Sequence, residues 1–333
     1  MSHDETLAFW VVGPGHGELR VETVPACRDE EARVRALYSG VSRGTESLVF
    51  DGCVPHSERE RMRAPFQRGD FAGPTKYGYA SVGLVEEGPA SLSGRTVFCL
   101  HPHQGRYVVP ADALYVVPPA VPPARAVLAA NLETALNAVW DSGAAPGDRV
   151  AIVGAGSVGS LVAWILARVP GCEVELIDTN PRRRSIADAF GIAFAKPDGA
   201  RPEADVVLHA SGSQEGLALA LSLAGFEATI CECSWYGKRS VTLPLGEAFH
   251  SRRLILKSSQ VGNVAPTHRP RWTVRRRMEL ALALLTDPAL DVLINSEGPL
   301  EDLPQAMQRL TRTPDDTIMH RVSYGAAREA SEP

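Results

Sequence analysis

The sequence predicts an α/β protein that joins a doubly wound parallel sheet to a β-rich domain, and three observations carry this prediction. A short apolar run at 150–153 leads directly into a G-x-G-x-x-G turn at 154–159. Apolar residues then recur at three- and four-residue steps from Val158 to Val169, which is the stripe of a helix packed on a sheet. Strand-like and helix-like segments continue to alternate to about residue 261, which favours parallel strands joined by helices.

The first part of the chain is β-rich. Its short apolar runs are broken by Gly, Pro and Asp at irregular intervals, which indicates a twisted, barrel-like domain. The segment 53–78 is rich in Pro, Arg and Gly, lacks periodicity, and is predicted to be a loop over a site. Residues 124–140 are expected to form a helix that leads into the parallel sheet. The expected strands are 7–12, 17–24, 32–38, 80–86, 96–100 and 105–109.

Beyond the glycine turn, the alternation of strands and helices continues and then stops near residue 263. The segment after 263 is expected to return and complete the β-rich domain, which gives the boundaries 1–125, 126–262 and 263–333. The tail 326–333 is expected to fray. The expected strands here are 174–177, 205–209, 228–231, 255–261, 291–294 and 317–322, and the expected helices are 181–190, 214–223, 275–285 and 303–310.

Composition excludes several classes of protein. The 333 residues are 44% hydrophobic and 22% charged, with a net charge of −5, so no basic surface for nucleic acid or anionic lipid is expected. The amino terminus lacks the features of a signal peptide, and no run reaches the roughly 18 apolar residues of a membrane span. The six cysteines are scattered without a C-x-x-C pair, which predicts reduced thiols in a cytoplasmic protein with no zinc knuckle.

The glycine turn predicts a dinucleotide site. Gly154 would allow a tight turn, Gly156 would let a pyrophosphate approach the backbone, and Gly159 would let the helix lie close to the strand. Ser157 and Val158 open the helix, whose amide groups and positive dipole end would face the phosphates. A plain βαβ unit with a glycine turn is the alternative.

Asp178 ends the next apolar run, about 20 residues after the glycines, where a carboxylate can accept hydrogen bonds from a ribose diol. Since this carboxylate would repel a 2′-phosphate, NAD(H) is favoured over NADP(H). Arg182, Arg183 and Arg184 keep NADP(H) open, because they could pair with a 2′-phosphate if Asp178 turned away.

These patterns resemble the medium-chain dehydrogenase/reductase superfamily over nearly the whole chain. The resemblance implies a GroES-like β-barrel-type catalytic domain, a Rossmann domain inserted into it, an active site between the two, and a homodimer joined through the Rossmann sheets. Further sequence segments resemble a narrower branch that includes the bacteriochlorophyllide hydroxyethyl dehydrogenases. That resemblance does not predict the same substrate for this protein. The matching segments are 40–43 and 78–86, with 292–310, and for the branch 38–46, 76–80, 101–104 and 131–137.

The chain departs from the zinc-dependent members of that superfamily at their metal ligands. Ser42 stands in place of a Cys and Tyr79 in place of a His, while Ala80 replaces the adjacent Glu. The third ligand position falls near Ala129 or Ala130, and the four-cysteine lobe of a structural zinc is absent. Because Ser, Tyr and Ala do not make a zinc donor set, the chain is identified as a zinc-free member.

The resemblance also implies roles for residues outside the glycine turn. Arg43 matches a position that contacts the pyrophosphate, where a guanidinium can fork onto phosphate oxygens, and a solvent-exposed loop arginine is the alternative. Arg183 matches a basic residue near the adenosine ribose, or else is an exposed helix residue. The expected cofactor-binding set is Arg43, Thr134, Gly154, Gly156, Ser157, Val158, Asp178, Arg183 and Ser211.

Without zinc, hydride transfer needs a donor for the developing oxyanion and a route for a proton. Tyr79 ranks first, because the resemblance implies that its phenol faces the nicotinamide. His101 follows, since it and His103 are two residues apart and one of them could titrate near neutrality. Glu46 and Ser42 complete the candidates, and each of the four could equally be structural. Zinc held by His101, His103 and Glu46 is a remote alternative.

The predicted function is therefore an NAD(P)-dependent, zinc-independent oxidoreductase that moves hydride between nicotinamide and an alcohol or ketone carbon of a small molecule. One alternative keeps the cofactor and reduces a polarised C=C or C=N bond. Another is a nucleotide-binding sensor that lost catalysis together with its metal ligands. The sequence does not identify the substrate, the direction or the stereochemistry.

Overall fold

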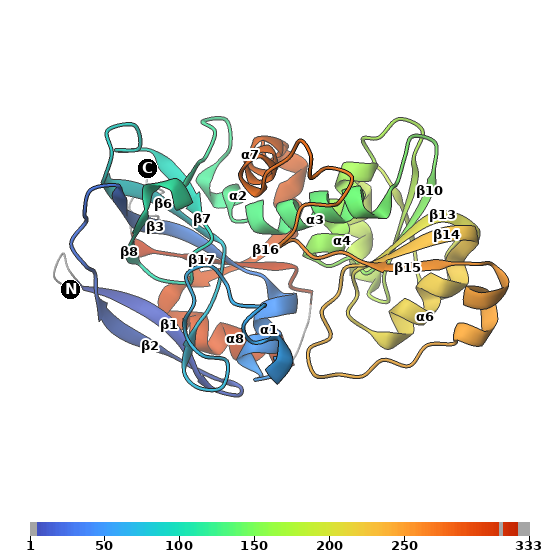
Figure 1. Cartoon of the computed structure of the whole chain (residues 1–333), viewed down its shortest axis with the longest axis horizontal. Helices are drawn as coiled ribbons and strands as arrows, with labels where there is room; N and C mark the ends of the chain where they lie inside the picture. Colours follow the sequence, from blue (N-terminus) through green and yellow to red (C-terminus); the bar gives the residue numbers. More distant parts are fainter. Residues whose placement is uncertain (1–4, 313–315, 326–333) are drawn as a thin grey trace. The chain divides into compact units, whose positions relative to one another are not determined.

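The computed structural model describes residues 5–312 and 316–325, so the expected frayed tail lies outside the described residues. The chain divides into two compact units (Figure 1). The first comprises Met1–Ala130 and Leu282–Pro333, and the second is Asn131–Ala281. The return to the first unit thus falls at 281/282 and not at the expected 262/263. The reason is that helix α7 (Val274–Leu284) is tied to the second unit by Arg277, whose Nε donates to Glu133 Oε1 at 3.0 Å.

The second unit contains the predicted parallel sheet. Its six strands run in the order β12-β11-β10-β13-β14-β15, and every neighbouring pair is parallel. The order reverses between β10 and β13, since the chain builds outward to β12 and then restarts on the other side of β10. The strands are β10 (Arg149–Val153), β11 (Glu173–Ile177), β12 (Ala193–Ala195), β13 (Ala204–His209), β14 (Ala224–Glu232) and β15 (Ile255–Ser258).

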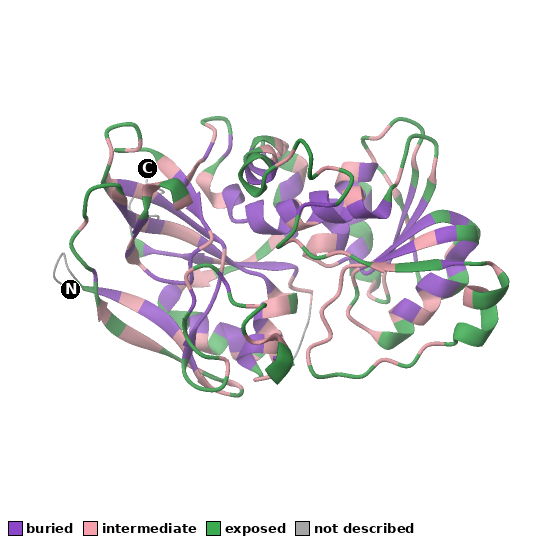
Figure 2. Ribbon diagram, viewed as in Figure 1, coloured by how far each residue is buried: buried purple, intermediate pink, exposed green. Residues whose placement is uncertain are grey.

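Helices cover both faces of this sheet, as the continuous apolar run of β10 predicts. Ala151 and Val153 of β10 pack in one cluster with Leu217 and Leu221 of helix α6. Figure 1 shows α6 on one side of the strands, with α3 and α4 on the other. Buried positions run through all of these elements in Figure 2. The helices are α3 (Ala129–Ser142), α4 (Ser157–Leu166), α5 (Arg184–Phe190) and α6 (Gln214–Leu223).

The first unit is built from two sheets, as the β-rich texture predicts. One has the order β2-β1-β5-β4, and the other has the order β16-β17-β3-β6-β7-β9, with β8 also paired to β3. The strands are β1 (Glu5–Gly13), β2 (His16–Thr23), β3 (Glu31–Val41), β4 (Arg68–Gly69), β5 (Thr75–Lys76), β6 (Ser81–Glu87), β7 (Thr96–Cys99), β8 (Arg106–Pro110), β9 (Tyr115–Val116), β16 (Ile294–Pro299) and β17 (Met319–Ser323).

The returning segment completes this unit. Helix α8 (Leu303–Arg312) packs through Leu303 and Met307 in a cluster with Phe9 and Phe50, the last of which belongs to helix α1 (Arg43–Phe50). Strand β17 pairs antiparallel with β3, so the carboxyl-terminal part of the chain adds to a sheet begun near residue 31. The segment from Leu282 onward is therefore grouped with the first unit.

Several expected elements differ from the structure, among them the expected helix 181–190, which is a 3₁₀ helix at Pro181–Arg183 followed by α5. The expected helix at 124–140 is two helices, α2 (Pro123–Ala126) and α3. The expected strand at 291–294 is mostly a 3₁₀ helix, Pro288–Leu293, because Asp287 caps it by accepting from the amide of Ala289, and Leu290 is buried beneath it. The last strand of the parallel sheet ends at Ser258, before the expected residue 261.

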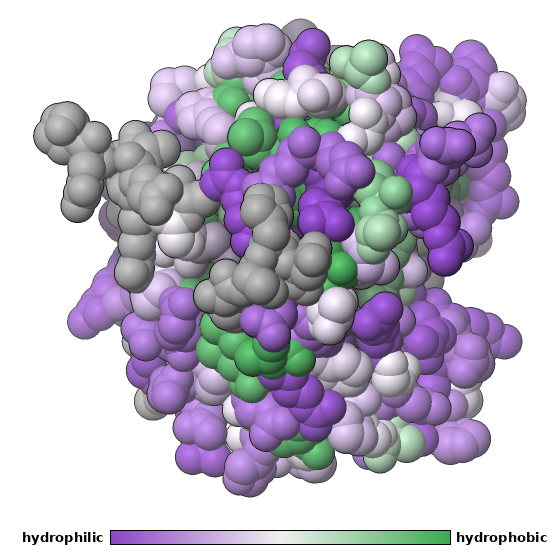
Figure 3. Space-filling model, turned by 90° about the vertical axis from the view of Figure 1, so that its left-hand side faces the viewer, coloured by the Kyte–Doolittle hydropathy of each residue, from purple (hydrophilic) through white to green (hydrophobic). Residues whose placement is uncertain are grey.

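The face of the molecule in Figure 3 is mostly hydrophilic, with small hydrophobic areas. Val21, on the outer strand β2 of the first unit, is one of the exposed apolar residues at 61% exposure. Within residues 5–312 and 316–325, no helix has both the length and the apolar character needed to cross a bilayer.

Candidate functional site

The glycine turn lies between β10 and α4, and each glycine has a distinct steric reason. Gly154 has φ +108°, and a Cβ on it would lie 2.5 Å from the amide nitrogen of Ser211. A Cβ on Gly159 would overlap the carbonyl oxygen of Gly154. By contrast, a Cβ on Gly156 would meet no atom within 4 Å. The turn therefore keeps open space beside Gly156, where a pyrophosphate would approach the backbone, so these residues fit a dinucleotide.

Helix α4 begins at Ser157 and Val158, with Gly156 as its cap residue. The amide groups and the dipole of its first turn suit an anion at this position. Thr134, from the expected cofactor-binding set, lies half-buried on helix α3 of the same unit.

Asp178 follows β11 and is bonded to the glycine turn. Its Oδ2 accepts from the amide of Ala155 at 2.7 Å, and its Oδ1 accepts from the amide of Asn180 at 2.8 Å. These bonds hold the half-buried carboxylate beside the turn. Each oxygen keeps a further lone pair, so the group can still accept from ribose hydroxyls.

The three arginines after Asp178 have different environments. Arg183 is buried at 6% exposure, which excludes the alternative of an exposed helix residue. The guanidinium of Arg184 lies 4.9 Å from the centre of the Phe194 ring. Arg182 is exposed, and its amide donates to the side chain of Asn180 at 3.0 Å.

A hydrogen-bonded group of polar side chains, centred on the buried His209, lies at the carboxyl ends of β13 and β14, and sequence reasoning missed most of it. His209 is fully buried, with Nε2 2.6 Å from Ser211 Oγ and Nδ1 2.7 Å from Glu232 Oε2. Tyr236 donates its hydroxyl to the same Oε2 at 2.9 Å, and the amide of Ser234 donates to Oε1 at 2.6 Å. The sequence predicts a cofactor-binding role for Ser211 and a strand that ends at His209, and it gives no role to Glu232, Ser234 or Tyr236.

A histidine that ends an apolar strand two residues before a serine was the available signal for this group. Burial pushes the pKa of Glu232 upward, but the hydrogen bonds from His209 and Ser234 outweigh it and hold that pKa below its usual value.

In the first unit, Tyr79 lies beside the start of helix α1. Its hydroxyl is hydrogen-bonded to the side chains of Ser42 and Thr45. Loss of water around the phenol, with a smaller effect from the charge of Glu46, raises the pKa of Tyr79 to about 12. The phenol is therefore neutral at physiological pH and is suited to donate a hydrogen bond. Arg43, the first residue of α1, is half-buried next to Ser42.

Glu46 is the centre of a buried chain of hydrogen bonds. Its Oε1 accepts from the amide of Ser42 at 2.7 Å, and its Oε2 lies 2.8 Å from Nε2 of His103. Nδ1 of His103 lies 2.7 Å from Ser39 Oγ, which is 2.9 Å from the hydroxyl of Tyr324. The structure thus brings Ser42, Tyr79 and Glu46 together, and it adds Ser39 from β3 and Tyr324 from the carboxyl-terminal segment.

His101 is not a histidine that titrates near neutrality. Its ring stacks on Tyr107 with centroids 3.7 Å apart, and Nδ1 lies 2.9 Å from the carbonyl oxygen of Pro102. Burial lowers the pKa of His101 to about 3, so the imidazole stays neutral. Its described contacts do not include Tyr79 or Ser42, which favours a packing role.

The residues at the expected metal positions do not fit zinc. Ser42 and Tyr79 offer hydroxyl groups, while Ala129 and Ala130 offer no ligand atom. In the described part of the chain, no three His, Cys, Asp or Glu side chains are grouped so that they could hold a metal ion. The alternative site of His101, His103 and Glu46 therefore lacks a suitable arrangement.

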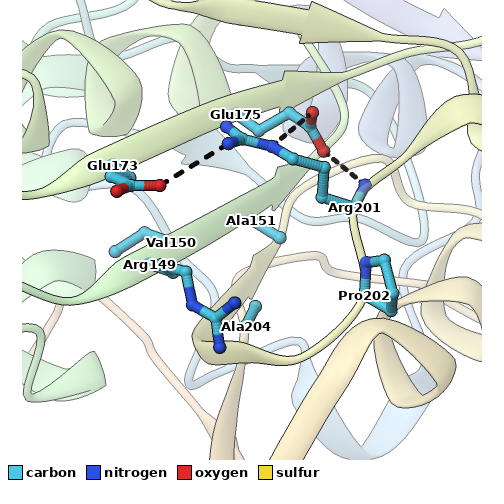
Figure 4. A pocket seen from close by; sticks show the side chains of 8 residues that line it. All are labelled: Arg149, Val150, Ala151, Glu173, Glu175, Arg201, Pro202 and Ala204. Carbon is cyan, nitrogen blue, oxygen red and sulfur yellow. Dashed lines mark hydrogen bonds and ion pairs between the residues drawn. The ribbon is translucent and has the colours of Figure 1, made fainter.

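A pocket of about 100 Å³ in the second unit lies at the amino ends of the strands of the parallel sheet, opposite the glycine turn (Figure 4). It is lined by Arg149, Glu173 and Ala204, the first residues of their strands. Arg201 fills part of it and pairs with Glu175 at 3.2 Å and with Glu173 at 3.5 Å. Because ligands of such sheets bind at the carboxyl ends of the strands, this pocket is not the candidate site.

Comparison with known proteins finds a family match to part of the second unit and similar solved structures for the complete fold. Residues 150–212, from Val150 in β10 to Gly212 after β13, match the family described as ketopantoate reductase PanE/ApbA. Among solved structures, L-idonate 5-dehydrogenase from Escherichia coli K-12 has a TM-score of 0.78 at 15% identity, covering 96% of this chain and 98% of its own. Alcohol dehydrogenase TADH from Thermus sp. ATN1 has a TM-score of 0.72 at 19% identity, covering 96% and 99%.

A third similar structure is described as a short chain alcohol dehydrogenase from Escherichia coli CFT073, complexed with cofactor NADH. Its TM-score is 0.75 at 15% identity, with 96% of this chain and 99% of that chain covered. At these identities the likeness shows the fold. The predicted fold class, a GroES-like β domain with an inserted Rossmann domain, is confirmed.

Proposed function

We propose that the protein is an NAD(P)-dependent oxidoreductase of the medium-chain dehydrogenase/reductase superfamily, acting on an alcohol or ketone without zinc. The observation that carries the proposal is the glycine turn, where two glycines are required by close packing and Gly156 leaves open space at the start of a helix. The fold supports it, because the similar structures include alcohol and polyol dehydrogenases.

The cofactor would be held by residues of the second unit. The amides at Ser157 and Val158 would bind the pyrophosphate, while Asp178 would accept from the adenosine ribose. Nicotinamide, when bound, supplies or accepts the hydride. NAD(H) is favoured because the Asp178 carboxylate is fixed beside the turn by two amides, at 2.7 and 2.8 Å, and so cannot easily turn away from a 2′-phosphate.

Tyr79 would donate a hydrogen bond to the substrate oxygen. Its pKa of about 12 keeps the phenol protonated, and its bonds to Ser42 and Thr45 fix the position of the hydroxyl. Ser42 would hold or pass on the proton, and Glu46 would position Ser42 through the 2.7 Å bond to its amide. The hydroxyl and alanine residues at the expected zinc positions support a metal-independent reaction.

The proposal is tested by binding and turnover together. NADH and NADPH titrations should give a lower Kd for NADH, and a panel of alcohols, ketones, enones and imines should show turnover of an alcohol/ketone pair. Tyr79→Phe should lower kcat about 10²- to 10⁴-fold while leaving the Kd for NADH unchanged. Tyr38→Phe, at a half-buried tyrosine on β3, is the matched control and should retain activity. Full activity in protein that contains no zinc by elemental analysis is also expected.

The same panel distinguishes the two alternatives. Turnover of enones or imines alone would assign reduction of a C=C or C=N bond. Binding of NADH without turnover of any substrate would identify a nucleotide-binding protein that has lost catalysis.

A homodimer is also part of the proposal. Strand β15 is the edge of the parallel sheet, and Ile255 and Leu256 on it are 55% and 37% exposed. An exposed apolar edge strand is suited to pairing with the same strand of a second copy. Ile255→Lys should convert the dimer to a monomer in light scattering after gel filtration, whereas Val21→Lys on β2 should leave the dimer intact.

A further inference from the structure

Two short segments of the first unit, 76–80 and 101–104, lie side by side on strand β1. Strand β5, where the first segment begins, pairs antiparallel with β1. Gln104, which ends the second segment, makes an isolated bridge to the same strand. The two segments therefore share one support, and the first carries Tyr79 while the second carries His103.

Gly78 brings the backbone of the first segment onto the imidazole of His103. Its φ is +137°, and a Cβ at this position would lie 3.1 Å from Nε2 of His103. The same Nε2 lies 2.8 Å from Oε2 of Glu46. The residue just before Tyr79 thus rests on a buried pair, so the position of Tyr79 depends on how closely the two segments are held together.

Lys76 joins the two segments through its side-chain nitrogen. Nζ donates to Oε1 of Gln104 at 2.5 Å and to Oε2 of Glu22, on strand β2, at 2.7 Å. Lys76 and Gln104 are 2% and 5% exposed, so the bond between them is shielded from water. Glu22 is held in turn by Nε1 of Trp10, which donates to its other oxygen at 2.6 Å.

The direction of the bond between Lys76 and Gln104 follows from the second partner of the glutamine. The carbonyl oxygen of Arg106 can only accept, so Nε2 of Gln104 faces it, at 2.8 Å. Oε1 is then the end that faces Lys76, and Lys76 must donate to it. Burial lowers the pKa of Lys76, with Glu22 opposing that shift, but an amine and an ammonium both have the hydrogens for these two bonds.

We propose that Lys76 and Gln104 are positioning residues for the proposed reaction. Their bond clamps the segment that carries Tyr79 against the segment that carries His103, and so sets where the Tyr79 hydroxyl lies. Both residues act through Tyr79. The inference rests on the proposed function, because it concerns the placement of the same proton donor.

Lys76→Met and Gln104→Met remove the clamp from its two sides. Each should lower kcat about 10- to 100-fold, the loss expected when a reacting group moves by about 1 Å, and should leave the Kd for NADH within about 2-fold because the second unit holds the cofactor. The double variant should lose no more than either single variant, since both remove the same bond. Losses that multiply in the double variant would overturn the inference.

Arg125→Met is the matched control. Arg125 is also a buried basic residue of the first unit, and its Nε and Nη2 donate to the two oxygens of Asp291 at 2.7 Å each. Its replacement should lower the melting temperature but leave kcat unchanged. A loss of kcat in Arg125→Met equal to that in Lys76→Met would assign the effect to general destabilisation and overturn the inference.

The environment of Tyr79 gives a readout that needs no turnover. An ultraviolet titration of Lys76→Met, minus that of the same variant with Tyr79→Phe, isolates the tyrosinate from Tyr79. Burial raises the pKa of this phenol to about 12 in the intact protein. Without the clamp, the midpoint should move toward the ordinary value of about 10. An unchanged midpoint would overturn the inference, and Arg125→Met should keep the midpoint of the wild type.

Lys76→Met leaves Glu22 without this partner and could unfold. Gln104→Met is the milder variant, because the pair of Lys76 and Glu22 remains in it, and the same titration and kinetics apply. Circular dichroism checks the fold of each variant.

The two proposals fail differently. Wild-type protein that turns over no substrate removes the proposed function, while the titration still decides whether Lys76 sets the position of Tyr79. Turnover by the wild type, with the same kcat in Lys76→Met and Gln104→Met, removes the inference and leaves the proposed function standing.

Discussion

Nε2 of His103 lies 2.8 Å from Oε2 of Glu46, and the two side chains are 1% and 4% exposed. Because the other oxygen of Glu46 accepts from the amide of Ser42, this pair ties the segment after β7 to the start of helix α1. Tyr79 is bonded at that same helix start. The buried pair therefore fixes the framework that positions the candidate proton donor.

Removing Glu46 should destabilise the first unit. Glu46→Ala leaves His103 and the Ser42 amide without their buried acceptor, which is expected to cost about 3–5 kcal/mol in the free energy of unfolding. Urea denaturation measures this cost. The exposed Glu60 is the control, and Glu60→Ala should change the same free energy by less than about 0.5 kcal/mol. Equal stability of the two variants would contradict the structural role.

Tyr79 should remain protonated through the whole physiological range. Its pKa is raised to about 12 by burial and by the charge of Glu46, so the phenol loses its proton only well above neutral pH. An ultraviolet titration of wild type minus Tyr79→Phe measures the tyrosinate from this residue alone. We expect no tyrosinate signal from Tyr79 near pH 10, although an ordinary tyrosine has a pKa of about 10. A midpoint near pH 10 would show that Tyr79 is solvated.

The second and third glycines of the turn should respond differently to alanine. Gly159→Ala overlaps the Gly154 carbonyl and should lower the melting temperature strongly. Gly156→Ala meets no protein atom within 4 Å, so the protein should keep its stability but lose affinity for NADH. Thermal unfolding and calorimetry on both variants measure the two effects. A fully stable Gly156→Ala protein with wild-type affinity would place the pyrophosphate elsewhere.

Glu232 should contribute stability that is lost in acid. Its folded pKa is below the unfolded value, so the contribution is complete above the unfolded pKa, about 4.3, and disappears as pH falls through the folded pKa. Glu232→Gln should therefore show a shallower loss of stability between about pH 5 and pH 3. Urea denaturation at stepped pH measures the slope. The exposed Glu215 is the control, and Glu215→Gln should keep the wild-type slope.

Arg277 should be essential to the second unit although it lies outside the predicted Rossmann domain. It is fully buried, with Nε 3.0 Å from Glu133 Oε1 and Nη1 3.3 Å from the carbonyl of Asn263. Arg277→Met should cost about 3–5 kcal/mol, because Glu133 would stay buried without a partner. Adding Glu133→Leu should recover part of that loss. The exposed Arg275, paired with Glu279, is the control, and Arg275→Met should cost less than about 1 kcal/mol.

Local patterns were sufficient for much of the parallel sheet. Residue type and spacing alone predict the strand β10, the glycine turn and helix α4, since buried parallel strands and their helices have distinct periodicities. The same reasoning failed at residues 291–294, where apolar residues typical of a strand form a 3₁₀ turn. There, the cap from Asp287 and the burial of Leu290 outweighed strand propensity.

Sequence reasoning also predicted only those parts of the candidate sites that are formed by residues close together in the sequence. Sequence reasoning placed Gly154, Gly156 and Asp178 at one turn, because the spacing of a strand–turn–helix unit is local. It did not find the bonds from Glu232 to His209 or from Tyr324 to Ser39, which join residues 23 and 285 positions apart. The sequence analysis names His101, and not His103, as a catalytic candidate. Residues adjacent to His101 in the sequence do not reveal that its ring stacks on Tyr107.

By itself, the sequence determined the parallel strands, the glycine turn and the absence of ligand side chains at the expected zinc positions, because each of these depends on residue type and short spacing. The tertiary structure decided which histidine meets Glu46, where helix α7 belongs, and that His209 meets Glu232. Those outcomes depend on burial and on contacts between distant segments, and hydrogen-bond direction is set by the partner that packing supplies.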